Sequence, residues 1–457
     1  MDRFDVLVVG SGSGMNIAAT AAGSGLKTAV VESGPMGGTC LNRGCIPSKM
    51  LIYPADVVAI AEEAKSIGVD ARVASVDFQK IMKRMQQFVA EDSMHQATAV
   101  EADPNITWLK GIGEFISDYT MRIGNRTIRG ERIFIVSGAR PDVPPVEGLR
   151  DTGYLTSDTI LKLETQPKTM LIVGGGYIAA EYGHFFSSIG TEVTILQRSP
   201  RLVPEEEPEV SELLKQEMSK KMKIFTNHEA VEAKDKDGLK TVLAKNRETD
   251  QVQEFSAETI LVAAGRVPNS DLLKPEKTGV ELDERGYIKV NEYLETRKKN
   301  LWALGDAIGK QMFKHVANYE AEIAWHNSSH EHKVKVDYSA APHAVFSHPQ
   351  IASVGLKEAE AKQQGKKIRV GMAHHKDTAL GVAMGEPAGF VKVIVEHDTG
   401  RLLGGHIIGP HASMLIQEIV NAMNTADRTF MPIARAMHIH PAMTEVVQRA
   451  FHNLREA

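Results

Sequence analysis

The sequence predicts an α/β fold with two copies of a strand–turn–helix–strand unit, followed by a C-terminal α+β domain. Both copies carry a glycine-rich turn after a short, apolar, β-branched run, the first at residues 4–32 and the second at residues 169–198. Beyond residue 340 the pattern changes to separate strands, such as GFVKVIV and GGHIIG, and then to helices, such as MLIQEIVNAMN. The length of 457 residues fits three domains of about 150 residues each.

Composition and charge are those of an ordinary globular protein. Hydrophobic residues make up 42%, charged residues 24%, and the net charge is −5, which offers no positive field for a nucleic acid or an anionic membrane surface. No run approaches roughly 18 consecutive apolar residues, so we expect no transmembrane helix. The N-terminus enters a strand at once and lacks the pattern of a signal peptide, so we expect a cytoplasmic protein.

The first unit opens with a turn suited to a dinucleotide. FDVLVVG is typical of a buried parallel strand, and glycine at Gly10 and Gly12 lets a pyrophosphate approach the backbone at the start of the next helix. Glu32 ends the second strand, where a carboxylate accepts from a ribose hydroxyl. Met15 fills the third fingerprint position, so we expect a wider helix–strand spacing there. The alternative is an ordinary glycine-rich turn.

The second unit repeats the fingerprint with Gly174, Gly176 and Ala179. Its second strand ends on Gln197 rather than on the acid that binds the 2′-hydroxyl of NAD. Arg198 and Arg201 follow, and arginine suits the 2′-phosphate of NADP. These residues favour NADPH over NADH, although both arginines could instead belong to a solvated surface turn.

The only two cysteines, Cys40 and Cys45, are five residues apart. Two cysteines are too few for a disulfide-stapled secreted fold. In a regular helix their Cα atoms would be about 8–9 Å apart, whereas a disulfide needs roughly 4.4–6.8 Å. A bridge therefore requires a distorted turn, which Gly44 and Pro47 permit. The alternatives are two ordinary buried thiols, or half of a zinc site that would need two further ligands.

The segment GGTCLNRGCIPSK at residues 37–49 resembles the redox-active disulfide segment of the flavoprotein pyridine nucleotide–disulfide oxidoreductases. Further segments resemble the same family in the same order, namely IVSGARP at 135–141, ILVAAGRVPN at 260–269, LWALGDA at 301–307, HAVFSHPQIASVGL at 343–356 and MHIHPAMTE at 437–445. The resemblance implies two Rossmann-like dinucleotide-binding domains and a C-terminal α+β dimerisation domain. It implies an FAD-binding domain at 1–148 and 270–340, an NAD(P)-binding domain at 149–269 and a dimerisation domain at 341–457.

The resemblance also implies roles for individual residues. Cys45 would lie beside the flavin and Cys40 would exchange with substrate, while His440 would be the acid–base, oriented by Glu445. Lys49 and Glu181 match the family's ion pair beside the isoalloxazine. The residues expected to bind FAD are Gly10, Gly12, Gly14, Glu32, Ser33, Gly38, Thr39, Lys49, Gly138 and Asp306. Those expected to bind NAD(P) are Gly174, Gly176, Tyr177, Ile178, Gln197, Arg198, Arg201 and Gly265.

The implied activity moves two electrons between NAD(P)(H), FAD, the cysteine pair and a small dithiol or disulfide, in a homodimer that serves cell redox homeostasis. CIPSK favours an activity like that of dihydrolipoyl dehydrogenase, acting on a lipoyl group. One alternative is an NADPH-dependent reductase of a low-molecular-weight disulfide, of the mycothione or glutathione reductase type. An alternative of another class is a flavoprotein electron carrier without disulfide turnover.

Histidines outside the His440 motif receive a structural interpretation. His438 and His440 could form a metal pair, but their register with Glu445 favours catalysis. We expect the remaining histidines to face solvent, including the following four: His330, His332, His374 and His375.

Overall fold

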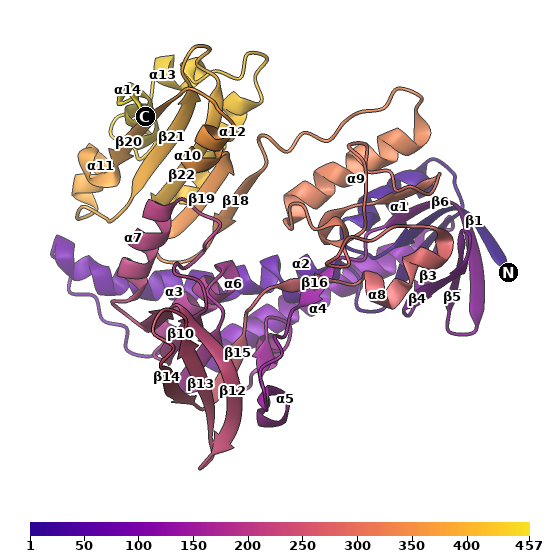
Figure 1. Ribbon diagram of the computed structural model, residues 1–457, viewed down its shortest axis with the longest axis horizontal. Coiled ribbons are helices and arrows are strands. Elements are labelled where there is room, and N and C mark those ends of the chain that lie inside the picture. Colours follow the sequence, from indigo (N-terminus) through magenta and orange to yellow (C-terminus); the bar gives the residue numbers. More distant parts are fainter. The chain divides into compact units, whose positions relative to one another are not determined.

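The computed structural model describes residues 1–457, and the chain divides into two compact units (Figure 1). Unit 1 comprises residues 1–50, 82–142 and 265–336. Unit 2 comprises residues 51–81, 143–264 and 337–457. Each unit is therefore assembled from three separate stretches of sequence. The finer division into three domains stays a prediction.

Unit 1 is centred on a seven-stranded sheet of order β3-β2-β1-β6-β5-β4, with β17 also pairing with β6. The pairs that join β3, β2, β1, β6 and β17 are parallel, whereas β4, β5 and β6 pair antiparallel. The strands are β1 (Asp2–Val9), β2 (Thr28–Glu32), β3 (Ile106–Lys110), β4 (Gly113–Ser117), β5 (Thr120–Ile123), β6 (Arg126–Ile135) and β17 (Leu301–Ala303). A separate ribbon pairs β7 (Ala139–Pro141) with β16 (Arg266–Pro268).

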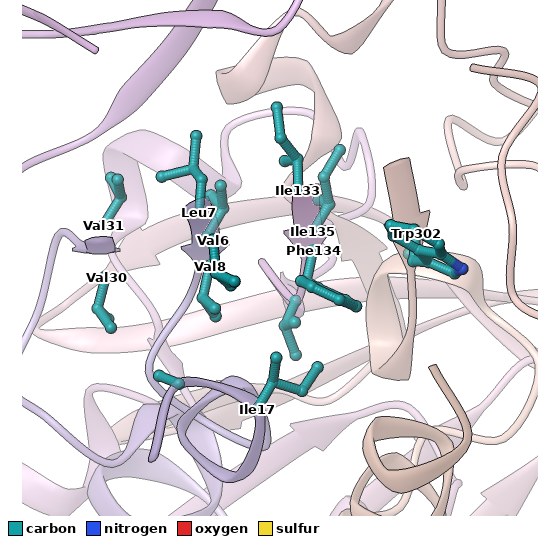
Figure 2. Close-up of a cluster of buried hydrophobic side chains, with 14 of the residues drawn as sticks. Val6, Leu7, Val8, Ile17, Val30, Val31, Ile133, Phe134, Ile135 and Trp302 are labelled. Atoms are coloured by element: carbon teal, nitrogen blue, oxygen red, sulfur yellow. The ribbon is translucent and has the colours of Figure 1, made fainter. Parts of the chain in front are cut away.

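The core of unit 1 lies between this sheet and the helices α1 (Gly14–Gly23) and α9 (Lys314–Ser329). Buried side chains of β1, β2 and β6 meet Ile17 of α1, and Trp302 of β17 stacks on Phe134 with ring centroids 5.1 Å apart (Figure 2). The β-branched and aromatic residues of these strands are buried on both faces, as a parallel sheet requires. The helices of unit 1 include α1 (Gly14–Gly23), α2 (Gly38–Arg43), α8 (Ser270–Leu273) and α9 (Lys314–Ser329).

Two longer helices, α3 (Cys45–Glu63) and α4 (Phe78–Ala102), pass from one unit into the other. By length and composition alone, one helical stretch at Gly38–Ile67 could cross a membrane. The stretch is interrupted at Gly44, and Leu41, Leu51 and Ile52 are buried within the protein. A single stretch of this kind is weak evidence for a membrane span.

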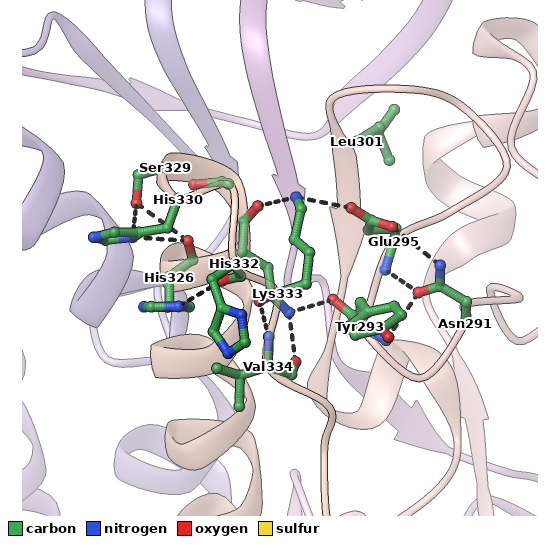
Figure 3. Close-up of polar contacts among 12 residues, drawn as sticks. Asn291, Tyr293, Glu295, Leu301, His326, Ser329, His330, His332, Lys333 and Val334 are labelled. Atoms are coloured by element: carbon green, nitrogen blue, oxygen red, sulfur yellow. Dashed lines mark hydrogen bonds and ion pairs between the residues drawn. The ribbon is translucent and has the colours of Figure 1, made fainter.

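The end of α9 is tied to the loop that precedes β17 by polar contacts (Figure 3). The amide of Asn327 donates to Tyr293 O at 3.1 Å and to Val334 O at 2.8 Å, and it accepts from Val334 N at 2.7 Å. Lys333 pairs with Glu295 at 3.1 Å. This network fixes Lys333 and Val334, in the segment that follows α9.

Unit 2 contains a second parallel sheet of order β11-β10-β9-β15-β8 and an antiparallel sheet of order β12-β13-β14. The strands are β8 (Leu155–Thr156), β9 (Thr169–Val173), β10 (Glu192–Gln197), β11 (Lys223–Thr226), β12 (His228–Lys236), β13 (Leu239–Asn246), β14 (Val252–Ala257) and β15 (Thr259–Val262). The helices here are α5 (Leu149–Thr152), α6 (Tyr177–Ser188) and α7 (Pro208–Met218). The two predicted strand–turn–helix–strand units are confirmed.

The C-terminal part of unit 2 forms a six-stranded antiparallel sheet of order β18-β19-β22-β21-β20-β23. Its strands are β18 (Pro342–Val345), β19 (Gln350–Gly355), β20 (Ile368–His374), β21 (Phe390–Glu396), β22 (Leu402–Gly409) and β23 (Arg455–Glu456). Its helices are α10 (Glu358–Gln363), α11 (Ala379–Ala383), α12 (Ala412–Met423), α13 (Met431–Arg435) and α14 (Glu445–His452). Apolar residues of α12 and α14 pack on the sheet, which confirms the predicted α+β domain.

Candidate active site

The glycine turn between β1 and α1 leaves no room for a side chain at Gly10, nor at Gly38, which packs against the turn. Gly10 has φ +110°, and a Cβ added there would lie 2.3 Å from Val136 O. Gly38, at the start of α2, has φ +63°, and its Cβ would lie 2.6 Å from Gly12 Cα. The backbone of the turn and the first turn of α2 therefore form a narrow cradle that only glycine permits.

Close packing of α1 against β1 occurs at Gly14 rather than at Met15. A Cβ added to Gly14 would lie 2.7 Å from Val8 Cγ1. Met15 is partly buried and packs against the edge of the core. Gly14 thus provides the close approach that the fingerprint usually assigns to its third position, one residue earlier in the chain.

Glu32 lies at the carboxyl end of β2, beside the glycine turn. Its Oε2 accepts from Ser11 N at 2.9 Å and from Ser11 Oγ at 2.8 Å, and its Oε1 accepts from Gly34 N at 2.7 Å. These bonds fix the carboxylate at the sheet edge, where a ribose binds in folds of this kind. Ser33 is exposed directly after Glu32.

The same part of unit 1 holds a buried hydroxyl without a hydrogen-bond partner and a buried acid. The hydroxyl of Ser137 is buried without a hydrogen-bond partner, between β6 and Gly138. Asp306 lies in the short helix Gly305–Ile308, and burial raises the pKa of its carboxyl. Its Oδ2 lies 3.7 Å from Arg266 Nε. An unsatisfied hydroxyl, a buried acid and a backbone cradle match the needs of a dinucleotide, so these residues fit FAD.

A break in the helix separates the two cysteines. Cys40 lies in α2, Gly44 leaves the helical region with φ −137° and ψ −109°, and Cys45 begins α3. A Cβ added to Gly44 would lie 3.1 Å from Thr39 O, so a side chain here would crowd the turn. Pro47 falls in the first turn of α3, where its missing N–H costs nothing. The distorted turn expected from Gly44 and Pro47 is present.

The break brings the two thiols into hydrogen-bond contact. Two effects raise the pKa of Cys40, namely its hydrogen bond to Cys45, which is the larger, and its burial. Cys45 is exposed, whereas Cys40 is half-buried. The one group of side chains close enough to hold a metal ion consists of Asp56, His184 and His348 and contains neither cysteine. The arrangement therefore favours thiol–disulfide chemistry over the zinc alternative.

Lys49 and Glu181 occupy different units. Lys49 lies on α3, where its ammonium donates to Ser48 Oγ at 3.2 Å. Glu181 is buried on α6 and accepts from Phe346 N at 3.1 Å. The ion pair between Lys49 and Glu181 stays a prediction.

His440 and Glu445 are brought together in the C-terminal part of unit 2. The Nδ1 of His440 lies 2.9 Å from Glu445 Oε1, and Ala442 N donates to Glu445 Oε2 at 3.1 Å. The hydrogen bond to His440 lowers the pKa of Glu445, which keeps this acid ionised. The imidazole itself is 70% exposed, so its Nε2 is available to a reacting group.

His438 is engaged with a different acid. Its Nε2 lies 2.7 Å from Glu418 Oε1 and its Nδ1 lies 3.2 Å from Ala436 O. Both ring nitrogens therefore have protein partners. His438 and His440 are thus bonded to different acids, which supports the catalytic interpretation of His440 over a metal pair.

The second glycine turn is built as the first is. Gly174 has φ +120°, and a Cβ there would lie 2.1 Å from Ala263 O. Gly176 precedes α6, whose first residues are Tyr177 and Ile178. Gly265 has φ +136° and begins the stretch that returns to unit 1.

The end of β10 presents positive charge to solvent. The side chain of Gln197 is buried, and its Nε2 donates to Arg201 O at 3.1 Å. Arg198 and Arg201 are exposed. The amide therefore fixes the turn that carries both guanidinium groups, and no carboxylate stands at the strand end.

The prediction that the remaining histidines face solvent is partly wrong. His330, His332 and His374 are exposed, but His375 is fully buried. Its ring nitrogens lie 3.2 Å from Met443 Sδ and 3.2 Å from Ile408 O, and desolvation lowers its pKa to about 4. His184 and His406 are buried as well. These rings are covered by neighbouring elements whose packing the local sequence does not reveal.

Several polar residues of the site have no clear signal in the sequence. Ser11 and Ser13 lie between the glycines of the turn, Ser137 follows β6, and Arg266 approaches Asp306 from a segment 40 residues earlier. Lys314 begins α9 and bonds Ser13. Each is a common residue type whose position depends on long-range folding.

Comparisons with known proteins agree with this geometry. The model of the pyridine nucleotide-disulphide oxidoreductase family matches residues 4–321, and that of its dimerisation domain matches residues 341–451. Mycothione reductase of Mycobacterium tuberculosis is 35% identical over 467 residues, covering 100% of both chains. A dihydrolipoyl dehydrogenase of Synechocystis is 34% identical, covering 98% of both. The Cu(II) complex of the HOCl-induced flavoprotein disulfide reductase RclA from Escherichia coli is 27% identical, with a TM-score of 0.88 and 99% of both chains covered.

Proposed function

The chain belongs to the pyridine nucleotide-disulphide oxidoreductase family, and we propose that it is an NADPH-dependent reductase of a small disulfide, with Cys40 and Cys45 as its redox pair. The family is FAD-dependent with NAD(P)H as electron donor, so the chain is an FAD-dependent disulfide oxidoreductase. The observation that carries the proposal is the hydrogen bond between the thiols across the break at Gly44.

FAD would be held by the first glycine turn and its surroundings. Gly10, Gly12 and Gly38 would admit the pyrophosphate, and Glu32 would accept from the ribose. Further contacts would come from Gly14, Ser33, Thr39, Lys49, Gly138 and Asp306. When bound, FAD supplies the two-electron carrier between nicotinamide and cysteines.

The chain's own residues account for the thiol chemistry. The thiolate of Cys40 attacks one sulfur of the substrate disulfide, which forms a mixed disulfide and releases the first substrate thiolate. His440 donates a proton to that leaving thiolate, while Glu445 holds the other ring nitrogen. Cys45 then loses its proton to the now neutral His440, attacks the sulfur of Cys40 and re-forms the Cys40–Cys45 bond, and the second substrate thiolate that leaves takes this proton from His440. Two electrons leave the cysteine pair, and the substrate disulfide becomes two thiols.

We propose a homodimer in which His440 of one chain serves the cysteine pair of the other. The match to the dimerisation domain and the 70% exposure of His440 support this arrangement. A stripe of exposed apolar side chains on α3 supports it as well, because Tyr53, Val57 and Ile60 are 68%, 51% and 63% exposed. Their spacing places them on one face of the helix.

The nucleotide end favours NADPH. Arg198 and Arg201 follow a strand that ends without an acid, and the bond from Gln197 to Arg201 O fixes their turn. Gly174, Gly176, Tyr177, Ile178 and Gly265 would complete this site. Relatives of the reductase and dehydrogenase types match at 35% and 34% identity, so identity does not separate them, and the cations at β10 are what supports the reductase proposal.

Dihydrolipoyl dehydrogenase activity is the second candidate. It is favoured by the CIPSK segment, in which Ser48 is buried and its hydroxyl donates to Cys45 O at 3.3 Å. In this direction His440 takes a proton from a dithiol such as a dihydrolipoyl group, and electrons leave to NAD(P)+. The thiol chemistry at Cys40 and Cys45 is otherwise the same.

Steady-state kinetics separate these candidates. The value of kcat/KM is measured for glutathione disulfide, mycothione disulfide and lipoamide, each with NADPH and with NADH. We expect the highest value for one of the two low-molecular-weight disulfides with NADPH. A preference for dihydrolipoamide with NAD+ would overturn the reductase assignment. Nicotinamide oxidation without turnover of any disulfide, and with both thiols unchanged, would indicate an electron carrier instead.

A further inference from the structure

Lys314 is a half-buried cation at the glycine turn of unit 1, and the backbone of that turn at Gly12 meets Gly38, two residues before Cys40. It is the first residue of α9, and its ammonium donates to Ser13 Oγ at 3.2 Å in the glycine turn. Ser13 is buried, and its hydroxyl donates in turn to Asn318 Oδ1 at 2.9 Å, one turn further along α9. This chain of hydrogen bonds fixes the ammonium at one place between α9 and the glycine turn.

Lys314 has no carboxylate as a counter-ion. The ionisable groups whose charges act on it are Cys40 and Cys45. Burial lowers the pKa of Lys314, and negative charge on either thiol raises it again. At Cys40, the hydrogen bond to Cys45 and burial raise the pKa, whereas the charge of Lys314 acts in the opposite direction.

Three other charged groups near the glycine turn and the cysteines have polar partners in the structure. Asp306, in the short helix before α9, lies 3.7 Å from Arg266 Nε. Glu320, on α9 itself, accepts from Gly305 N at 2.6 Å. Lys49, on α3, donates to Ser48 Oγ at 3.2 Å. Among these groups, Lys314 is the cation whose ionisable neighbours are Cys40 and Cys45.

We propose that Lys314 is a positioning residue that stabilises the thiolate of the reduced Cys40–Cys45 pair. A half-buried ammonium without an anion is costly, and a thiolate formed beside it provides that anion. When the pair is reduced, one thiol loses its proton to solvent and its negative charge faces Lys314. The inference rests on the proposed function, because it concerns the thiolate that the disulfide exchange uses.

Alkylation of the reduced holoenzyme tests this role without relying on turnover. After reduction with dithiothreitol and its removal, the rate of iodoacetamide labelling at Cys40 and Cys45 is followed against pH by peptide mass spectrometry. We expect Lys314→Met and Lys314→Gln to raise the pH midpoint of labelling by about one unit or more. Lys314→Arg, which keeps the charge, should stay close to wild type.

Lys310→Met is the matched control, because Lys310 is an exposed lysine of the loop that leads into α9. It should label as wild type does. Flavin absorbance checks that each variant retains FAD. If Lys314→Met loses FAD, the labelling of Lys314→Gln decides the test. If both neutral variants label with the wild-type midpoint, the role of Lys314 is refuted.

The two levels of the proposal fail differently. If wild type reduces no disulfide but its labelling midpoint still depends on Lys314, the proposed function fails and the electrostatic role stands. If wild type turns over disulfides and the neutral variants keep its midpoint, the function stands and the role of Lys314 fails.

Discussion

Reversal of charge at Arg198 should change the choice of nucleotide. A 2′-phosphate carries about −1.5 to −2 charges. Because Arg198 is exposed, water-like screening applies, and each unit charge pair at about 4 Å is worth about 1 kcal/mol before salt reduces it by roughly a third. Replacing the positive charge of Arg198 by a negative charge turns an attraction to the 2′-phosphate into a repulsion, which changes the binding free energy of NADPH by about 2 kcal/mol. Arg198→Glu should therefore lower the NADPH/NADH ratio of kcat/KM by a factor of about 30.

The assay measures kcat/KM for both nucleotides with one disulfide substrate at fixed ionic strength. Lys162→Glu is the control, because it reverses another exposed cation of unit 2 that has no assigned role in binding. It should leave the ratio within about twofold of wild type. A ratio in Arg198→Glu that equals that of Lys162→Glu would refute the assignment of β10 to a 2′-phosphate.

Other substitutions test the remaining parts of the site. Cys45→Ser should retain FAD but lose disulfide turnover by several orders of magnitude, because Cys40 alone cannot re-form the bond; substantial turnover of any disulfide would contradict its role. Glu445→Gln should lower kcat by about 10- to 100-fold with little change in KM, through loss of the bond to His440 Nδ1, and unchanged kcat would remove the carboxylate from the mechanism. Gly10→Ala should yield protein with little bound FAD, because the new Cβ would lie 2.3 Å from Val136 O; a full flavin content by absorbance would count against the cradle. Desolvation lowers the pKa of the buried His375 from its ordinary value of 6.5 to about 4, so its neutral form stabilises the fold above pH 6.5 and this stabilisation is lost as pH falls towards 4. The loss should approach about 3 kcal/mol, and His375→Gln should flatten the dependence of the thermal midpoint on pH between 6.5 and 4.5; an equally steep dependence in that variant would show that other groups cause it.

Patterns of short period predicted the fold well. Apolar β-branched runs followed by glycine gave β1 and β9, and the alternation of strands and helices after residue 340 gave the C-terminal sheet with α12. Gly10 and Gly174 are found at positive φ, where a side chain would meet the backbone of the neighbouring strand connection. Such residues can be recognised because the constraint acts on the residue itself.

Contacts between segments far apart in the chain could not be predicted from the sequence. The burial of His375 depends on Met443 and on the carbonyl of Ile408, which come from elsewhere in the C-terminal domain. Lys314 reaches Ser13 across about 300 residues, and only the packing of α9 beside the glycine turn makes it relevant to the thiols. The pair Cys40 and Cys45 was recognisable because Gly44 and Pro47 stand close to both in the chain.

A peptide map of the oxidised and NADPH-reduced holoenzyme shows whether Cys40 and Cys45 form a disulfide that NADPH reduces. Trypsin cleaves after Arg43, between the two cysteines, and after Lys49. The account predicts that the peptides of residues 28–43 and 44–49 remain joined in the oxidised enzyme and separate, each with one alkylated cysteine, once NADPH is added without any added thiol. If both cysteines react with the alkylating agent before reduction, or if NADPH leaves the linked peptides intact, the proposed redox pair is contradicted.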